Sequence, residues 1–73
     1  MFASNELKNN FEIVFEAVKH DGRNLKYASE ELKNNFEIVF EAVKNRGSVS
    51  LGFASDEMKN NFEIVYEAVK NRR

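Results

Sequence analysis

A single phrase of 18 residues occurs three times in this chain, and its repetition limits the folds that the chain can adopt. The copies read FASNELKNNFEIVFEAVK at 2–19, YASEELKNNFEIVFEAVK at 27–44 and FASDEMKNNFEIVYEAVK at 53–70. The first two copies agree at 16 of 18 positions, so each copy solves the same packing problem with the same side chains. Because 73 residues suffice for one small domain, we predict a single domain of three repeats, at 2–26, 27–52 and 53–73.

The second half of each phrase has the period of a helix. Its apolar residues fall at i, i+3, i+4 and i+7 with two more that widen the stripe, and in the first copy they are Phe11, Val14, Phe15, Val18, Ile13 and Ala17. A strand would also gather apolar residues on one face, but the flanking residues favour a helix. Asn10 is suited to an N-cap, and Gly22 and Gly47 are suited to the position just after a helix. We therefore predict a helix of about ten residues in each repeat.

The first half of each phrase predicts a shorter helix. Ser4, Ser29 and Ser55 can each cap a turn or two in which a glutamate occupies the second helical position. An Asn-Asn corner then separates the short helix from the long one, and a connector leads to the next repeat. The predicted fold class is all-α, with three tandem helix-turn-helix repeats of about 25 residues.

The long helices are too apolar to be stable without neighbours on several sides. Two architectures provide that cover: a compact bundle with a pseudo-threefold arrangement of the long helices, or a short α-solenoid in which each repeat touches only the next. Solenoids usually end in repeats with a polar outer face, whereas the first and third copies here are as apolar as the second. Either the bundle closes on itself or another chain covers its ends.

The aromatic residues of the long helices are the predicted core and self-association residues. They recur in pairs four residues apart, and they are Phe11, Phe15, Phe36, Phe40, Phe62 and Tyr66. Near-identical copies joined by short connectors also favour exchange of a repeat between two chains. We therefore expect a protein partner, which can be a second copy of this chain.

Composition excludes several classes of protein. The chain has no cysteine, which rules out disulfides and Cys-ligated metal centres and fits a reducing compartment such as the cytoplasm. Its longest apolar run is three residues, far below the roughly 20 that a membrane-spanning helix needs, and the first residues do not form a signal peptide. We expect no membrane association.

The sequence lacks the residues that most enzymes and metal sites need. His20 is the only histidine, and Glu16 four residues earlier would give two ligands, which do not make a metal site. The glutamates spaced four apart on each long helix are better explained as an exposed strip than as a catalytic pair. No nucleophile with a base, and no phosphate-binding glycine loop, is found. We expect no enzyme activity, no metal, no cofactor and no small-molecule substrate.

Basic residues near the helix ends raise the alternative of nucleic-acid binding. The residues at matching places are Lys44, Arg46, Lys70 and Arg72, and helical arrays can read one base per repeat. However, 11 Lys and Arg against 12 Asp and Glu leave the chain nearly neutral, and cations at a helix C-terminus complement its dipole. These residues are therefore predicted to be a polar surface.

The segment YASEELKNN at 27–35, followed by EIV at 37–39 and EAVKNRG at 41–47, resembles the short repeats known as domain of unknown function 4116. The resemblance covers nearly the whole chain and implies repeats of the kind found in tandem arrays, without an established activity or site. The chain departs from the family pattern in two sets of positions. Asparagine replaces the usual aspartate at 10, 35 and 61, and phenylalanine replaces a polar residue at 11, 36 and 62.

Taken with the absence of catalytic parts, the repeats predict a non-enzymatic module for protein–protein interaction or scaffolding that associates with itself. Two alternatives remain open at this point. One is a designed or consensus repeat protein with no natural ligand, which would explain the uniformity of the copies. The other is a nucleic-acid-binding helical repeat.

Overall fold

The computed structural model describes residues 5–71, and within them the chain forms helices and no strand. The all-α prediction is therefore confirmed. The segments are α1 (Asn5–Lys8), α2 (Phe11–His20), η1 (Gly22–Tyr27), α3 (Glu30–Lys33), α4 (Phe36–Arg46), α5 (Ser48–Leu51), α6 (Asp56–Lys59) and α7 (Phe62–Lys70). The three long helices α2, α4 and α7 have 10, 11 and 9 residues, which agrees with the predicted length of about ten.

The helices begin at the predicted caps. The side-chain oxygens of Asn10, Asn35 and Asn61 accept hydrogen bonds from the backbone N–H three residues later, at 3.0, 3.1 and 3.2 Å. The hydroxyls of Ser29 and Ser55 do the same for α3 and α6, both at 3.2 Å. Each cap satisfies an N–H that has no partner inside its helix. The predicted cap Ser4 lies outside the described residues.

One of the two predicted glycine stops is correct and the other is not. Gly47 follows α4 with φ of 60°, a left-handed conformation that costs glycine little. Gly22 does not end α2, because Asp21 in an extended conformation takes that position. Gly22 instead opens η1, where the Asp21 side chain accepts the N–H of Arg23 at 3.0 Å. The aspartate cap removes the need for a left-handed glycine there.

The connectors are helical, which the sequence analysis missed. The segment η1 is a 3₁₀ helix of six residues, and α5 is a single α-helical turn. Leu25 in η1 is fully buried, and Ser50 in α5 is buried with no hydrogen-bond partner for its hydroxyl among the described residues. Each connector thus forms a second layer behind the long helices.

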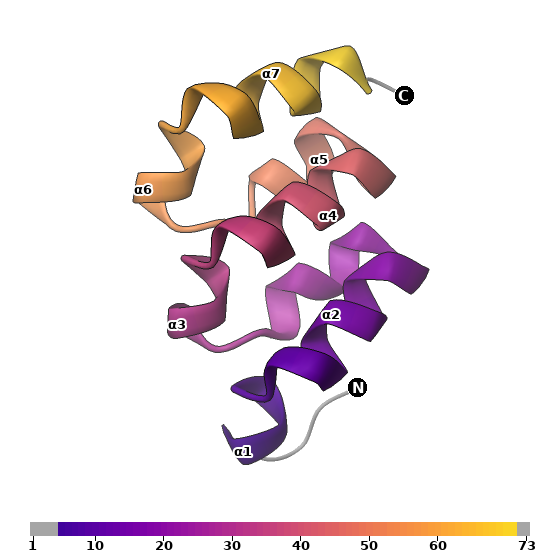
Figure 1. Ribbon diagram of the computed structural model, residues 1–73, viewed down its shortest axis with the longest axis vertical. Coiled ribbons are helices and arrows are strands. Elements are labelled where there is room, and N and C mark those ends of the chain that lie inside the picture. The colour runs from indigo at the N-terminus through magenta and orange to yellow at the C-terminus, as the bar shows by residue number, and fades with distance from the viewer. Residues whose placement is uncertain (1–4, 72–73) are drawn as a thin grey trace.

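The repeats stack in a line rather than closing into a threefold bundle. Helix α4 packs between α2 and α7, which lie on its opposite sides (Figure 1). The molecule is elongated along the direction of stacking (Figure 1), with a long axis of 33 Å and other extents of 22 and 16 Å. Of the two architectures left open by the sequence, the structure has the short open stack.

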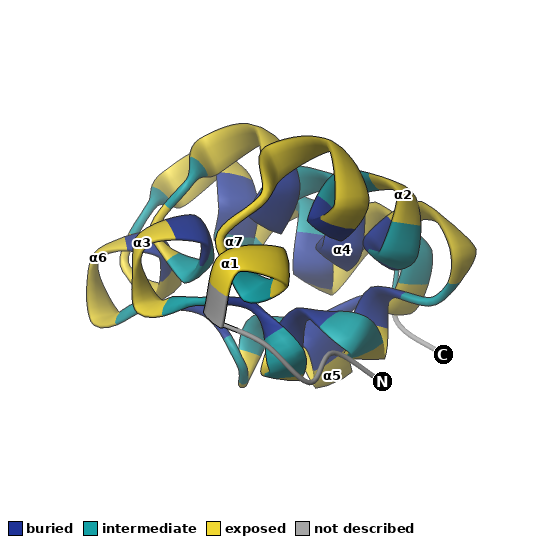
Figure 2. Ribbon diagram, turned by 90° about the horizontal axis from the view of Figure 1, so that it is seen from below, coloured by how far each residue is buried: buried dark blue, intermediate teal, exposed yellow. Residues whose placement is uncertain are grey.

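The stack has two layers with the core between them. The long helices form one layer and η1 with α5 forms the other, and Figure 2 shows the buried residues between the two. The core consists of aliphatic residues from both layers, together with the start of α3 and α6: Val14, Val18, Leu25, Ala28, Leu32, Ile38, Val39, Ala42, Val43, Ala54, Met58, Ile64 and Ala68.

The six aromatic residues, predicted as core and self-association residues, do not form the buried core, and their part in self-association stays a prediction. Phe15 and Phe40 pack against the core while remaining partly exposed, whereas the other four are exposed: Phe11, Phe36, Phe62 and Tyr66. The physical reason is the second layer. The connector helices cover the aliphatic side of each long helix, so the arc that carries the rings faces outward. Among residues 5–71, no helix is long and apolar enough to cross a membrane.

Candidate interaction surfaces

Consecutive repeats are joined by a polar seam that appears twice with the same geometry. The backbone N–H of Ser29 donates to the carbonyl oxygen of Lys8 at 2.9 Å, and its hydroxyl donates to the side-chain oxygen of Asn9 at 2.6 Å. One repeat later, Ser55 makes the equivalent bonds to Lys33 and Asn34 at 3.0 and 2.6 Å. The first asparagine of the first two corners therefore binds the next repeat, while the second asparagine caps its own helix.

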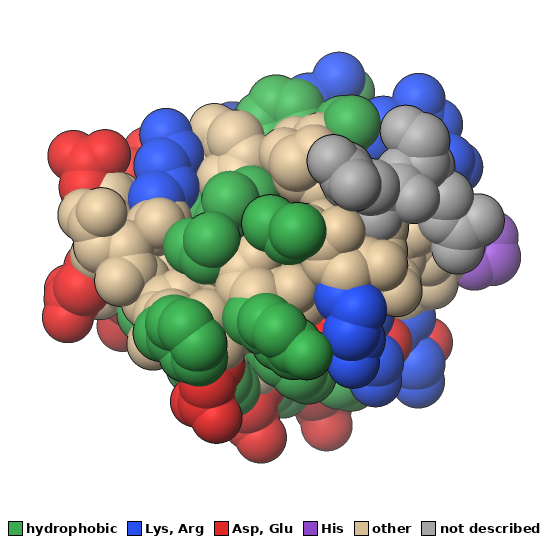
Figure 3. Space-filling model, turned by 90° about the horizontal axis from the view of Figure 1, so that it is seen from above, with side chains coloured by type: hydrophobic (Ala, Val, Ile, Leu, Met, Phe, Trp, Pro, Cys, Tyr) green, Lys and Arg blue, Asp and Glu red, His purple; other side chains and the backbone are tan. Residues whose placement is uncertain are grey.

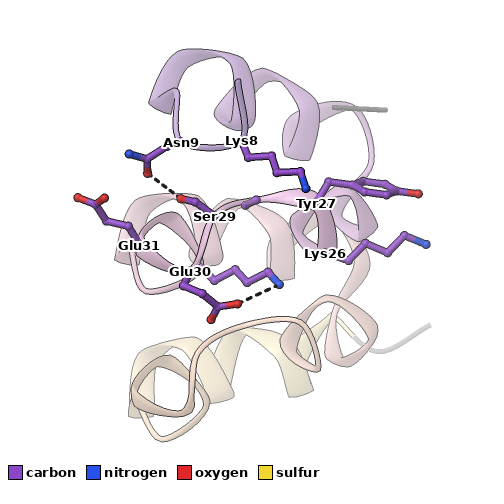
Figure 4. A pocket seen from close by; sticks show the side chains of 9 residues that line it. Lys8, Asn9, Lys26, Tyr27, Ser29, Glu30 and Glu31 are labelled. Atoms are coloured by element: carbon purple, nitrogen blue, oxygen red, sulfur yellow. Dashed lines mark hydrogen bonds and ion pairs between the residues drawn. The ribbon is translucent and has the colours of Figure 1, made fainter. Parts of the chain in front are cut away.

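The first seam borders a shallow open hollow on the surface (Figure 4). Three lysines and two glutamates line it: Lys8, Lys26, Lys33, Glu30 and Glu31. Lys33 pairs with Glu30 at 3.8 Å, and the ammonium of Lys26 lies 5.1 Å from the centre of the Tyr27 ring. These mixed charges and existing contacts are typical of a solvated surface.

The first junction is also held by an asparagine clasp. The side chain of Asn45 accepts the N–H of Gly22 at 2.8 Å and donates to the carbonyl oxygen of Lys19 at 3.3 Å. A Cβ at Gly22 would collide with the carbonyl oxygen of Ala42, so glycine allows α4 to approach this closely. In the third repeat Asn71 instead donates to the carbonyl and carboxylate of Glu67 in its own helix.

Asp21 lies at the centre of a small ion-pair network at the same junction. Its carboxylate accepts from Arg23 at 2.7 Å and from Arg46 of the next repeat at 3.1 Å. Hydrogen bonds from the side chain and backbone of Arg23, with a further one from Arg46, hold the pKa of the Asp21 carboxyl well below its usual range. The network links the first two repeats with charge.

The aromatic pairs form a ladder along the three long helices. The ring centres of Phe11 and Phe15 are 5.5 Å apart, and those of the corresponding pairs on α4 and α7 are 5.4 and 6.1 Å apart, all three pairs being stacked. A lysine lies over the second ring of each pair: Lys19, Lys44 and Lys70, at 5.5, 5.9 and 5.7 Å from the ring centre. The second ring of each pair therefore has an aromatic neighbour and a cationic one.

The predicted polar surface residues are placed as follows. Lys44 and Lys70 are exposed and pair with the glutamate three residues earlier, at 3.7 and 3.5 Å. Arg46 binds Asp21, and Arg72 lies outside the described residues. The structure does not bring these four predicted residues together, and the three that it describes already have acidic partners.

The predicted metal and carboxylate features remain local. His20 and Glu16 are both exposed on α2, and Glu16 pairs with Lys19 at 3.4 Å. No group of three or more His, Asp or Glu side chains that could hold a metal ion is found in the described part of the chain. Glu16, Glu41 and Glu67 are instead each paired with the lysine three residues later.

The two ends of the stack expose apolar positions that the middle buries. One valine position is fully buried in the first two repeats, as Val18 and Val43. The equivalent residue of the third repeat, Val69, is 56% exposed. One isoleucine position is fully buried in the second and third repeats, as Ile38 and Ile64. The equivalent residue of the first repeat, Ile13, is 37% exposed. These positions mark the uncovered side of α7 and of α2.

The α7 end shows the larger effect. Phe11 and Phe36 are each 38% exposed, whereas Phe62 is 80% exposed, because no following helix covers its side of α7. Figure 3 looks onto this end and shows hydrophobic side chains gathered across it, with acidic side chains along the lower edge. We call Phe62, Val65, Tyr66 and Val69 the α7 end face, and Ile13 with Ala17 the α2 end face.

Sequence reasoning selected Phe62 and Tyr66 but missed Val65, Val69, Ile13 and Ala17. These residues can be identified only by comparing the copies. A side chain that packs against the next repeat in the first two copies has no such neighbour in the third copy. Asn45 and Asp21 were missed as well. The available sign for Asp21 was that the second copy has Arg46 at the same position, and the sign for Asn45 was that only the first copy differs there, with His20.

Comparison with protein families identifies the repeats. The model of a family described as a domain of unknown function, DUF4116, matches three overlapping segments, at 1–33, 10–51 and 35–73. Because these segments together span the chain, the chain belongs to this family. Comparison with curated proteins and with solved structures finds no match.

Proposed function

We propose that this member of the DUF4116 family is a non-enzymatic helical-repeat module that binds other proteins or holds them in a scaffold. The single observation that carries the proposal is Val69, which is 56% exposed although the same valine is fully buried in both earlier repeats. A cluster of exposed apolar residues at one end of a small domain is typical of a protein-binding surface. The aromatic residues beside it are of the type that anchors such surfaces.

The charged residues support a structural role for the remainder of the surface. On α2, α4 and α7 a lysine pairs with the glutamate three residues before it, at 3.4, 3.7 and 3.5 Å. Pairs of opposite charge three residues apart are typical of a helix surface and stabilise the helix modestly. A reducing compartment such as the cytoplasm fits the cysteine-free sequence and belongs to the same proposal.

The test compares three immobilised forms of the protein in an extract of the cells that produce it. The forms are the wild type, Val69→Glu, and a control, Val49→Glu, which places the same charge on α5 at a valine that is 54% exposed. We expect Val69→Glu to lose proteins that the wild type and the control retain. Those proteins, once purified, should bind the wild type and the control again. Identical capture by all three forms would contradict the proposal.

Nucleic-acid binding is the second candidate, and the lysines that line the seam hollow are the observation in its favour. Lys8, Lys26 and Lys33 lie around that hollow with Tyr27. A fluorescent single-stranded oligonucleotide titrated at low salt tests it, because phosphate contacts weaken steeply as salt rises. Binding that disappears with salt and with Lys8→Glu would favour this candidate over the protein-binding one.

A further inference from the structure

The two end faces of the stack correspond to the two sides of each internal junction. Among the long helices α2 has only α4 beside it, and it buries Val14 and Val18 while Ile13 is exposed, so its valines mark the side toward the next repeat. Among the long helices α7 likewise has only α4 beside it, and it buries Ile64 and Ala68 while Val69 is exposed, so the isoleucine and alanine mark the side toward the preceding repeat.

Helix α4 has both neighbours, and it buries both kinds of residue. All four of Ile38, Ala42, Val39 and Val43 are fully buried, and by the pattern of the end helices we assign the first two to the side of α2 and the two valines to the side of α7. Both internal junctions therefore pack a valine side of one long helix against an isoleucine–alanine side of the next. The uncovered side of α7 is a valine side, and the uncovered side of α2 is an isoleucine–alanine side.

The side chains at the two ends repeat those of the internal junctions. The nine residues at 11–19 and 36–44 are identical, and those at 62–70 differ from them only in having Tyr66 in place of Phe40. Helix α7 thus presents outward the valines that α4 presents to α7. Helix α2 presents outward the isoleucine and alanine that α4 presents to α2.

We propose that a second copy of this chain docks head to tail, with its α2 end face on the α7 end face of the first. The inference rests on the proposed function as a protein-binding module and names its partner. The contact would reproduce the packing that the chain already uses twice, with Ile13 of one copy against Val65 and Val69 of the other. Because the two faces differ, each added copy leaves a new α7 end face, and the assembly grows without closing.

The polar contacts of the internal junctions are only partly available at this contact. Histidine at 20 stands where Asn45 clasps the preceding repeat, and arginine at 73 stands where Gly22 and Gly47 stand in the earlier repeats. The head-to-tail contact therefore depends on the apolar faces of the long helices. It is consequently weaker than an internal junction, and assembly depends on protein concentration.

The experiment measures mass by sedimentation from micromolar to millimolar concentration for four forms of the full chain. They are the wild type, Val69→Glu, Ile13→Glu and the control Val49→Glu. We expect the mass of the wild type and the control to rise past that of a dimer with concentration. Each end-face variant keeps one face but has no partner for it, so each should remain a monomer.

The mixture of the two end-face variants is the decisive sample. Val69→Glu retains the α2 end face and Ile13→Glu retains the α7 end face, so together they can form one contact and stop at a 1:1 pair. Circular dichroism melting shows whether each variant is folded. If Ile13→Glu is not folded, Ala17→Glu replaces it as the variant of the α2 end face. A dimer that persists in either single variant would indicate like-to-like pairing and overturn the inference.

A wild type that remains a monomer at every concentration would also overturn it. That result would leave the proposed function to be decided by the comparison of captured proteins, which does not depend on self-association. Conversely, head-to-tail assembly without capture of another protein would identify the second copy as the partner.

Discussion

Helices α4 and α7 have almost the same sequence but different surroundings. Val43 and Val69 occupy the same position, yet Val43 is fully buried between two helices and Val69 is 56% exposed at the end of the stack. On the side toward the preceding repeat the two helices are buried alike, since Ile38 of α4 and Ile64 of α7 are both fully buried. The difference shows that one sequence can be core on one side and candidate interface on the other, depending only on which neighbours exist.

Truncating the same isoleucine in the middle and at the end should give the largest difference. Ile38→Ala should cost about 2–5 kcal/mol because it opens a cavity in the core. This is comparable with the roughly 3–5 kcal/mol that so small a core supplies. Ile13→Ala should cost about 1 kcal/mol or less, because its side chain is already partly exposed. Urea unfolding at low protein concentration measures both values, and equal losses would contradict the comparison.

Adding a methyl group at the three glycines should separate the two junctions from the rest of the surface. A Cβ at Gly22 would collide with the carbonyl oxygen of Ala42, and one at Gly47 would collide with that of Asn71. We expect Gly22→Ala and Gly47→Ala each to lose about 1–3 kcal/mol of stability from overpacking. The φ of 60° adds further strain at Gly47.

Gly52 is the matched control for these variants. Its φ of −61° and ψ of −20° suit any residue, and the nearest atom to an added Cβ is 3.5 Å away. Gly52→Ala should therefore leave stability unchanged or raise it by about 0.4–1 kcal/mol, because alanine reduces the freedom of the unfolded chain. Thermal melts of the three variants measure the order. A loss at Gly52 as large as at Gly22 would show that close packing is not confined to the junctions.

Removing the asparagine clasp should weaken the first junction more than the equivalent change weakens the third repeat. Asn45→Ala leaves the N–H of the buried Gly22 without its partner and should cost about 1–2 kcal/mol. Asn71→Ala removes bonds only within α7 and should cost less. Amide hydrogen exchange should show faster exchange at Gly22 in the first variant alone. Unchanged protection of Gly22 would mean that the clasp does not hold the junction.

The ion-pair network should give the smallest effect, and one that depends on pH. The folded state holds the Asp21 carboxyl pKa below its unfolded value of about 3.9, so the contribution to stability is complete above that pH and is lost as pH falls below it. Asp21→Asn should remove this dependence, together with the pairs to Arg23 and Arg46. The midpoint of thermal unfolding as a function of pH measures it. An identical acid profile in wild type and variant would contradict this assignment.

The local structure could be predicted because its determinants lie close together in sequence. Asn35 caps the N–H of Ile38, and Ser29 caps that of Leu32, both within three residues. The apolar period of the long helices is equally local, so their type and length were predicted correctly. The connector helices were missed because Gly22 and Gly47 suggested breaks. Leu25 is stabilised in η1 by burial between layers, which is a tertiary effect.

The placement of the aromatic residues depended on contacts that no single copy reveals. Phe36 and Phe40 are the largest apolar side chains of α4, and size alone suggests the core. The structure buries Ile38 and Val39 instead, because α2, α7 and the connectors surround the aliphatic arc. Helical period defines which residues share a face, but the neighbours define which face is inside.

The sequence by itself determined three all-helical repeats, their caps and the apolar arc that each long helix must cover. Only the tertiary structure decided that the repeats form an open stack, with α4 between α2 and α7 (Figure 1). The physical reason is that local hydrogen bonds and helical period act within a repeat and are the same in all three. Burial depends on neighbours, and the first and last repeats each lack one, so identical valines and isoleucines become core in the middle and surface at the ends.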